Sequence, residues 1–355
     1  MKLSFSIQNW NETGWSEFCD VAQNTHMSGI ELYDIEGGNF SGKTSPTNPE
    51  LSAFSRRDLT RRGLAIPCID TVRDFTDIGF AREISESIRA AINLGAACIG
   101  IHTIEDDLDK CASSIEEILE IAGESPVTIL VETTGAFAST LYLRDLLNRF
   151  SDDRLAALWD MYATTVEGGE DAETTITNLG AYVRHVHIHD YKGTREEAEP
   201  ELFAEGKLPL EDLMNALRSV NYDGFISLFW DPDWAPEIAD LEIILTHFAT
   251  GMSRFENTRL HKKHLYWNNR HTGKYVWKKG VLIDKTFPQV LDTMVEEFPD
   301  QLAIKYTTLD YTRTYEEFRQ DVDQFARALI SLGVKPGSKV AIWATNVPAW
   351  FITFW

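Results

Sequence analysis

Over roughly the first 250 residues, apolar and polar positions follow two different periodicities. Short runs rich in apolar and β-branched residues predict strands. Between them, apolar residues recur every three or four positions, as in Ile84, Ile88, Ala91 and Leu94, which predicts helices that bury one face. We expect strands at residues 3–9, 29–34, 64–70, 98–103, 127–132, 155–160, 183–190 and 225–230. The helices between and after them are expected at residues 15–25, 48–62, 81–94, 114–122, 138–149, 173–182, 210–220 and 235–249.

Eight strands, each followed by a helix, predict the α/β class and a (β/α)8 TIM barrel over residues 1–250. The competing fold is a doubly wound open sheet, which usually has a Gly-rich phosphate loop after its first strand. Here the first strand leads into Gln8-Asn-Trp-Asn-Glu-Thr, which has no such loop. The pattern therefore favours the barrel.

The pattern changes after the barrel. Basic residues accumulate over residues 251–279 with weak periodicity, so we expect a basic linker, with a nucleic-acid-binding patch as the alternative. Periodicity resumes over residues 280–355, where we expect helices at 287–298 and 347–355 and strands at 302–307 and 338–344. Residues 312–318 are expected to lead into a further long helix that ends at 332. The chain stops inside the apolar run Trp350-Phe-Ile-Thr-Phe-Trp355. We expect this part to be the truncated start of a domain of a longer polypeptide, since that apolar face has no partner.

Composition narrows the classes of partner. The formal net charge is -22, which disfavours nucleic acid or an anionic membrane as a general partner. No stretch of the sequence reaches the length of a membrane span, and the first residues lack the pattern of a signal peptide. Four scattered cysteines without metal-ligand spacing suggest a reduced, cytoplasmic protein. A homo-oligomer is compatible with the sequence.

Three histidines stand at alternate positions of the seventh predicted strand: His185, His187 and His189. Successive side chains of a strand point to opposite faces, so all three imidazoles point the same way. Such a row is a candidate site for a metal or for a polyhydroxylated substrate. The alternative is a polar barrel interior in which the histidines are structural.

The polar residues that close each strand are the next candidates, because active sites of (β/α)8 barrels lie at the C-terminal ends of the strands. Glu132, Asp160 and His187 come from the fifth, sixth and seventh strands and could converge on one divalent cation. Mixed oxygen and nitrogen ligands suit Mn²⁺, Mg²⁺, Co²⁺ or Zn²⁺. The other polar residues at strand ends are Gln8, Asn9, Tyr33, Asp34, Asp70, His102, His189 and Asp231.

Several motifs of residues 1–250 resemble the xylose-isomerase-like TIM barrel superfamily of sugar phosphate isomerases and epimerases. These are Val127-Thr-Ile-Leu-Val-Glu132, Ala157-Leu-Trp-Asp160, Arg184-His-Val-His187-Ile-His-Asp190, Ala204-Glu-Gly206 and Tyr222-Asp-Gly224-Phe-Ile-Ser-Leu. The resemblance implies metal ligands in the order glutamate, aspartate, histidine, glutamate, and Glu132, Asp160 and His187 match the first three. Two positions depart from the family pattern: Phe229 stands at the fourth ligand position, and Ala163 stands where a substrate-holding histidine is usual.

The resemblance implies isomerisation or epimerisation of a small sugar, sugar phosphate or related polyhydroxy carbonyl compound through an enediolate. Glu132 is the proton-transfer candidate, and His102, Asp70 and His189 are candidates for substrate contacts. Asp231 keeps the strand parity of Phe229 and could compensate for the missing glutamate or contact substrate. The alternative function is a catalytically degenerate barrel that binds or docks for a fused ligase.

The last part of the chain, residues 280–355, resembles the start of AMP-forming acyl-CoA synthetases. The motifs are Phe298-Pro-Asp-Gln-Leu-Ala-Ile, Thr314-Tyr-Glu-Glu-Phe and Leu332-Gly-Val-Lys-Pro-Gly-Ser-Lys-Val-Ala-Ile-Trp. The resemblance implies an AMP-binding domain of a ligase, and its ATP-contacting segments lie further along such chains. We therefore expect ligase activity only in a longer polypeptide.

Overall fold

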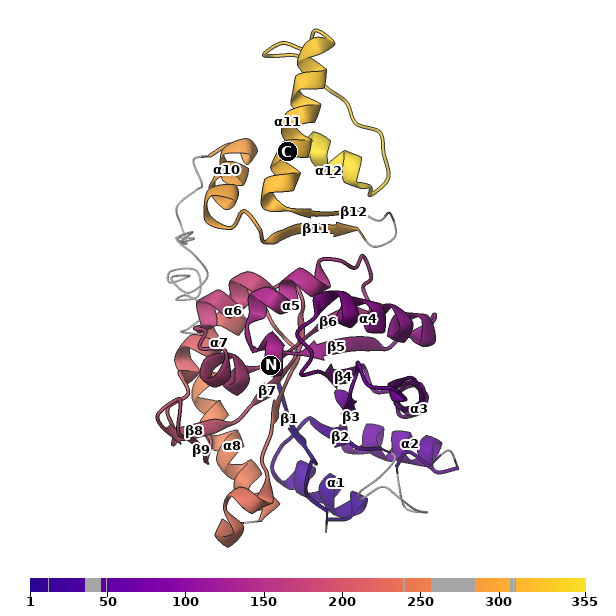
Figure 1. Ribbon diagram of the computed structural model, residues 1–355, viewed down its shortest axis with the longest axis vertical. Coiled ribbons are helices and arrows are strands. Elements are labelled where there is room, and N and C mark those ends of the chain that lie inside the picture. The colour runs from indigo at the N-terminus through magenta and orange to yellow at the C-terminus, as the bar shows by residue number, and fades with distance from the viewer. Residues whose placement is uncertain are drawn as a thin grey trace.

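The structure is a computed structural model of the chain (Figure 1). It describes residues 1–355 except 12, 36–45, 49, 239, 257–284, 307, 308 and 310. Of the predicted basic linker, residues 251–256 continue a helix, and residues 257–279 lie outside the described residues. Every helix in the described part of the chain is too short or too polar to cross a membrane.

Eight parallel strands close into a barrel in the order β1-β10-β7-β6-β5-β4-β3-β2, which confirms the predicted fold. Each strand carries inward-facing and outward-facing residues alternately, and the outward ones pack against the surrounding helices. The barrel strands are β1 (Lys2–Ser6), β2 (Gly29–Tyr33), β3 (Cys68–Asp74), β4 (Cys98–His102), β5 (Thr128–Glu132), β6 (Leu155–Asp160), β7 (Val183–Ile188) and β10 (Phe225–Leu228).

Helices follow the strands around the outside of the barrel, as the apolar spacing predicts (Figure 1). In α3, for example, Ile84, Ile88, Ala91 and Leu94 are buried. Asp107 starts α4 by accepting hydrogen bonds from the backbone of Asp109 and Lys110, a normal N-cap. The helices are α1 (Trp15–Asn24), α2 (Ser52–Arg62), α3 (Phe80–Leu94), α4 (Leu108–Ala122), α5 (Thr140–Leu147), α6 (Ala172–Leu179), α7 (Leu210–Ser219) and α8 (Leu241–Glu256).

Three features of the barrel differ from the prediction. The third strand was expected at residues 64–70, but β3 begins at Cys68, just after Pro67, which has no backbone N–H to donate to a sheet. A hairpin that was not predicted follows β7. It consists of β8 (Asp190–Gly193) and β9 (Ala198–Glu201). A π-helix at Ala163–Glu167 follows β6 where a loop was expected.

Residues 285–355 form a smaller α/β unit with α10 (Phe287–Glu297), β11 (Leu302–Tyr306), β12 (Tyr311–Thr314), α11 (Tyr315–Ser331) and α12 (Pro348–Phe354). The predicted strand at 338–344 is wrong, because these residues have no regular structure and are exposed. A strand needs a hydrogen-bonded neighbour, and β11 and β12 pair only with each other.

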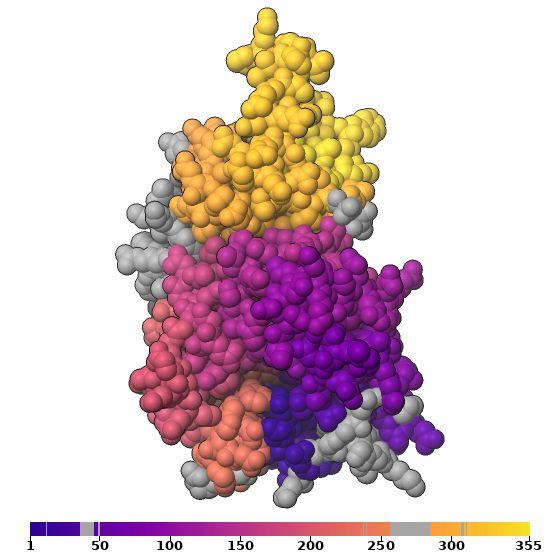
Figure 2. Space-filling model, viewed as in Figure 1, coloured from indigo at the N-terminus to yellow at the C-terminus, as the bar shows by residue number. Residues whose placement is uncertain are grey.

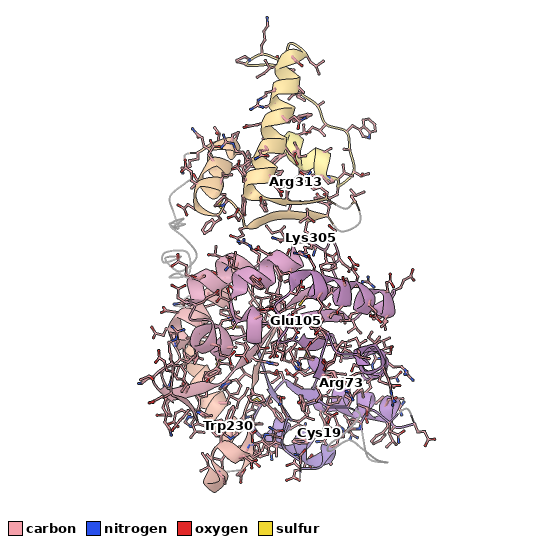
Figure 3. The ribbon with its side chains drawn as sticks, viewed as in Figure 1. Cys19, Arg73, Glu105, Trp230, Lys305 and Arg313 are labelled. Atoms are coloured by element: carbon pink, nitrogen blue, oxygen red, sulfur yellow. The ribbon has the colours of Figure 1, made fainter. Side chains whose placement is uncertain are left out.

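The smaller unit contacts the barrel beside the N-terminal ends of β6 and β7 (Figure 2). Lys305 faces the barrel in Figure 3; its Nζ donates to the carbonyl of Asp152 at 3.2 Å and lies 5.2 Å from the ring centroid of Tyr182. The hydroxyls of Ser151 and Thr312 are 3.0 Å apart. The contact therefore involves residues just before two barrel strands, at the end opposite their C-terminal tips.

Candidate metal centre

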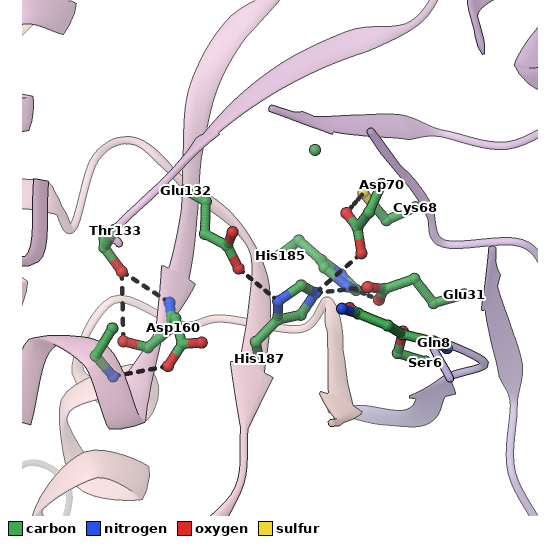
Figure 4. Close-up of polar contacts among 12 residues, drawn as sticks. Ser6, Gln8, Glu31, Cys68, Asp70, Glu132, Thr133, Asp160, His185 and His187 are labelled. Atoms are coloured by element: carbon green, nitrogen blue, oxygen red, sulfur yellow. Dashed lines mark hydrogen bonds and ion pairs between the residues drawn. The ribbon is translucent and has the colours of Figure 1, made fainter. Parts of the chain in front are cut away.

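Three polar side chains converge at the C-terminal ends of β5, β6 and β7 (Figure 4). Glu132, Asp160 and His187 each offer one ligand atom, and these atoms all lie within 4.8 Å of one another. Asp160 and His187 are partners in the register of β6 and β7, so their side chains point to the same face. Asp160 is held on both sides, since its backbone N–H donates to Thr133 Oγ1 and its Oδ1 accepts from the Ala163 N–H, each at 2.8 Å.

The chain turns sharply after Asp160, and this turn fixes the carboxylate. The N–H that binds Asp160 Oδ1 belongs to Ala163, the first residue of the π-helix. Gly168 ends the turn against Ala138, where an added Cβ would lie 2.0 Å from the Ala138 carbonyl oxygen. A side chain at Gly168 would therefore displace the segment that orients Asp160.

His187 lies between two carboxylates. Its Nδ1 is 2.9 Å from Glu132 Oε1, and its Nε2 is 2.5 Å from Glu31 Oε1. The second oxygen of Glu31 is 2.5 Å from His185 Nε2, and Asp70 Oδ2 is 3.7 Å from His187 Nε2. Figure 4 shows Glu132 and Asp160 on one side of the His187 ring and Glu31 and Asp70 on the other.

Glu31 is the residue that the sequence reasoning missed. It lies in the middle of β2 and is fully buried, inside a strand that otherwise reads as a buried apolar run. The signal that could have found it is a lone carboxylate at an inward-facing position of such a strand, because buried carboxylates need a partner. Through His185 and His187 it forms a second group of ligand atoms within 4.8 Å.

The charges in this cluster shift several pKa values. Burial opposes ionisation of His187, but the charge of Glu31 and hydrogen bonds to Glu132 and Glu31 outweigh it and hold its pKa well above the usual value. Burial also opposes ionisation of Glu31, yet His187 and His185 keep the pKa of this carboxyl well below its usual value. Burial and the charge of Glu31 raise the pKa of Asp70 well above its usual value. The charges around them therefore favour the ionised form of Glu31 and the protonated form of Asp70.

The pKa shift of Asp160 bears most directly on cation binding. Burial and, next, the charge of Glu132 raise its pKa from 3.8 to about 7, although His187 acts in the opposite direction. Two carboxylates therefore repel each other across a space that one imidazole borders. Two carboxylate oxygens and an imidazole nitrogen form a donor set that fits a divalent cation.

The remaining candidates lie around this group. His102 closes β4 and is half-buried, and His189 follows β7 and is buried. Burial, and then the charge of His187, lower the pKa of His189 to about 3, which keeps its ring neutral. Asp231 is at the rim, where its carboxylate accepts from Asn9 Nδ2 at 2.5 Å and from the Asp233 N–H at 2.8 Å. Among the described residues it belongs to neither group of converging ligand atoms.

The sequence profile described as xylose isomerase-like TIM barrel matches residues 21–244. The chain therefore belongs to this family. Its C-terminal part, residues 291–355, matches the profile of AMP-binding enzymes.

Solved structures share the barrel at low sequence identity. A xylose isomerase domain protein from Planctomyces limnophilus has a TM-score of 0.57 at 14% identity, covering 73% of this chain and 96% of that one. A D-tagatose 3-epimerase-like protein has a TM-score of 0.55 at 18% identity, covering 72% and 100%. The IOLI protein, solved with a bound zinc atom, has a TM-score of 0.57 at 14% identity, covering 71% and 99%. These similarities establish the fold.

Curated relatives match only parts of the chain. An uncharacterised protein of Methanocaldococcus jannaschii, MJ1311, is 24% identical over 161 residues, which are 41% of this chain and 54% of that protein. The mitochondrial medium-chain acyl-CoA ligase ACSF2 of Danio rerio is 32% identical over 71 residues, which are 20% of this chain and 12% of the ligase. The chain thus spans about half of one relative and a small part of the other.

Proposed function

We propose that the barrel is a metal-dependent isomerase or epimerase acting on a small sugar, sugar phosphate or related polyhydroxy carbonyl compound. The observation that carries the proposal is the convergence of Glu132, Asp160 and His187 at the C-terminal end of a xylose isomerase-like barrel. Sugar epimerases are among the proteins that share this fold, and one protein of this fold was solved with zinc. These similarities support a sugar isomerase or epimerase type of function.

Glu132, Asp160 and His187 would hold the cation, His187 through Nδ1, the nitrogen that faces the two carboxylates. A divalent cation supplies Lewis-acid polarisation of the substrate carbonyl and of the oxygen beside it. The Nε2 of His187 faces Glu31, so this carboxylate fixes the ring orientation and the tautomer that leaves Nδ1 available.

Glu132 is the proposed proton-transfer group. It is half-buried, and besides holding the cation it would take the proton from the carbon next to the carbonyl. The C–H electron pair then forms a carbon–carbon double bond, and the carbonyl oxygen becomes the negative oxygen of an enediolate. Return of the proton to the former carbonyl carbon, together with transfer of the neighbouring hydroxyl proton to the enediolate oxygen, completes an isomerisation. Because Phe229 cannot act as a base, one-base isomerisation is easier to support than two-base epimerisation.

The test is deuterium uptake. The chain is loaded with Mn²⁺ and incubated in D₂O with a panel of aldoses, ketoses and their phosphates, and exchange at the carbon beside the carbonyl is followed by NMR. Glu132→Gln should lower exchange by about 10²-fold or more. Glu83→Gln, which alters a buried glutamate on α3, serves as the matched control. Absence of exchange with every compound, despite Mn²⁺ binding, would show a binding barrel without this reaction.

A further inference from the structure

Four aromatic rings form one continuous surface, which we call the aromatic wall: Tyr162, His189, Phe229 and Trp234. The centroid of the His189 ring lies 4.1 Å from Tyr162, 5.7 Å from Phe229 and 5.2 Å from Trp234. Phe229 and Trp234 are 5.2 Å apart with their planes at 70°. These separations are those of packed aromatic pairs. The wall spans the segments that follow β6, β7 and β10, and three of its rings are only partly buried.

The wall borders the proposed cation ligands. In the register of β10 and β7, Ser227 is opposite His187, and Phe229 N–H donates to the Ile188 carbonyl at 3.0 Å. Phe229 and His189 therefore lie two residues beyond that pair, one layer closer to the mouth. Tyr162 lies in the helical turn that follows Asp160, and its ring packs on His189. A molecule held by the ligand group would have the wall beside it.

Two polar atoms in and beside the wall have no hydrogen-bond partner among the described residues: His189 Nδ1 and Trp230 Nε1. His189 and Trp230 are 7% and 4% exposed, and Trp230 packs against Trp234 at 5.5 Å. Unpartnered buried polar atoms are rare, because each loses the hydrogen bond that water gives it in the unfolded chain. A neutral imidazole can accept or donate, so His189 Nδ1 could be satisfied by a hydroxyl or by water that accompanies a ligand.

We propose that the aromatic wall selects a ring-shaped polyhydroxy substrate, a pyranose or a cyclic polyol ketone, by stacking against the apolar C–H face of its ring. This inference rests on the proposed function and narrows its substrate class. The C–H bonds on one face of a ring are already held together, so the carbon skeleton loses no further rotational freedom on binding. The ring can also direct its hydroxyls to the ligand group and to His189. An open-chain polyol would bury hydroxyls against Phe229, which offers no acceptor.

The test compares two polyols with six carbons and six hydroxyls, myo-inositol as the ring and sorbitol as the open chain. Their dissociation constants are measured by calorimetry on the full chain, with and without Mn²⁺. We expect myo-inositol to bind about 3- to 10-fold more tightly than sorbitol, the range of one aromatic contact. Phe229→Leu keeps an apolar side chain but removes the ring face, and it should abolish this preference while leaving the Mn²⁺ dissociation constant unchanged.

Two further variants complete the test. Phe54→Leu alters a phenylalanine on α2 that is 62% exposed and should keep the preference. Phe229→Glu should tighten Mn²⁺ binding and lose the preference, because it exchanges the ring face for a further oxygen ligand. Equal binding of both polyols, or saturable binding of neither, overturns the inference while Mn²⁺ binding stays intact. Failure of Mn²⁺ to bind the parent chain counts against the proposed function itself.

Discussion

Replacing Asp160 by asparagine should stabilise the metal-free protein while weakening metal binding. The carboxylate is 9% exposed and faces Glu132 across the proposed cation site. An amide has nearly the same shape, and its oxygen can still accept from the Ala163 N–H that now binds Oδ1 at 2.8 Å. The substitution therefore removes a buried charge and retains the hydrogen bond that positions the side chain.

The magnitude follows from the pKa of Asp160, which burial and the charge of Glu132 raise from 3.8 to about 7. Each pH unit of difference corresponds to about 1.4 kcal/mol, so the ionised carboxylate destabilises the fold by roughly 4 kcal/mol at pH 8. Below pH 3.8 the carboxyl is protonated in both the folded and the unfolded state. Between pH 3.8 and 7 the folded state keeps a proton that the unfolded state has lost, so stability falls as pH rises. At pH 5.5 the same relation gives roughly 2 kcal/mol.

The assay is urea unfolding of the full chain in EDTA, followed by circular dichroism. We expect Asp160→Asn to be more stable than the parent by about 1–4 kcal/mol at pH 8, with a smaller advantage at pH 5.5. Mn²⁺ should stabilise the parent far more than the variant, because ligand binding to the folded state adds to its stability. A variant that is less stable than the parent at pH 8, or an advantage that grows toward pH 5.5, would refute this account of the cluster.

Three other predictions concern the same region. Glu31→Gln should weaken Mn²⁺ binding about 10- to 100-fold, because the hydrogen bond that orients His187 is weakened. Calorimetry measures the Mn²⁺ dissociation constant. An effect no larger than that of Glu83→Gln contradicts the prediction. Mn²⁺ binding should release about one more proton at pH 6 than at pH 8, since Asp160 is protonated only at the lower pH. Calorimetry in buffers of different ionisation enthalpy measures the number of protons released. Equal release at the two pH values contradicts the prediction. Asp190→Asn should cost about 2–4 kcal/mol of unfolding free energy, because that carboxylate accepts four backbone N–H bonds. Urea unfolding compares this variant with the exposed control Asp145→Asn. Equal effects of the two substitutions contradict the prediction.

The barrel could be predicted because its strands and helices differ in local periodicity. The convergence of Glu132, Asp160 and His187 could be predicted because parallel strands of one barrel bring their C-terminal ends together. Glu31 could not be found by that rule, since it lies mid-strand and reaches His187 from the far side of the ring.

Other features depend on contacts between distant segments. The packing of Tyr162 and Trp234 against His189 joins three segments that follow different strands, and nothing in the local pattern of any one segment specifies it. The expected strand at 338–344 shows the converse. Its sequence is suited to a strand, but in the described chain no strand pairs with these residues.

The contact of the smaller unit with the barrel affects how a small molecule could pass from one part to the other. Lys305 and Thr312 meet Asp152 and Ser151, which precede β6, whereas the proposed site lies beyond the other end of the same strand. The closed barrel stands between the two, filled by side chains such as the hydrogen-bonded pair Ser4 and Ser227. Among the described residues, the filled barrel interior therefore offers a compound at the mouth no direct route to the C-terminal unit.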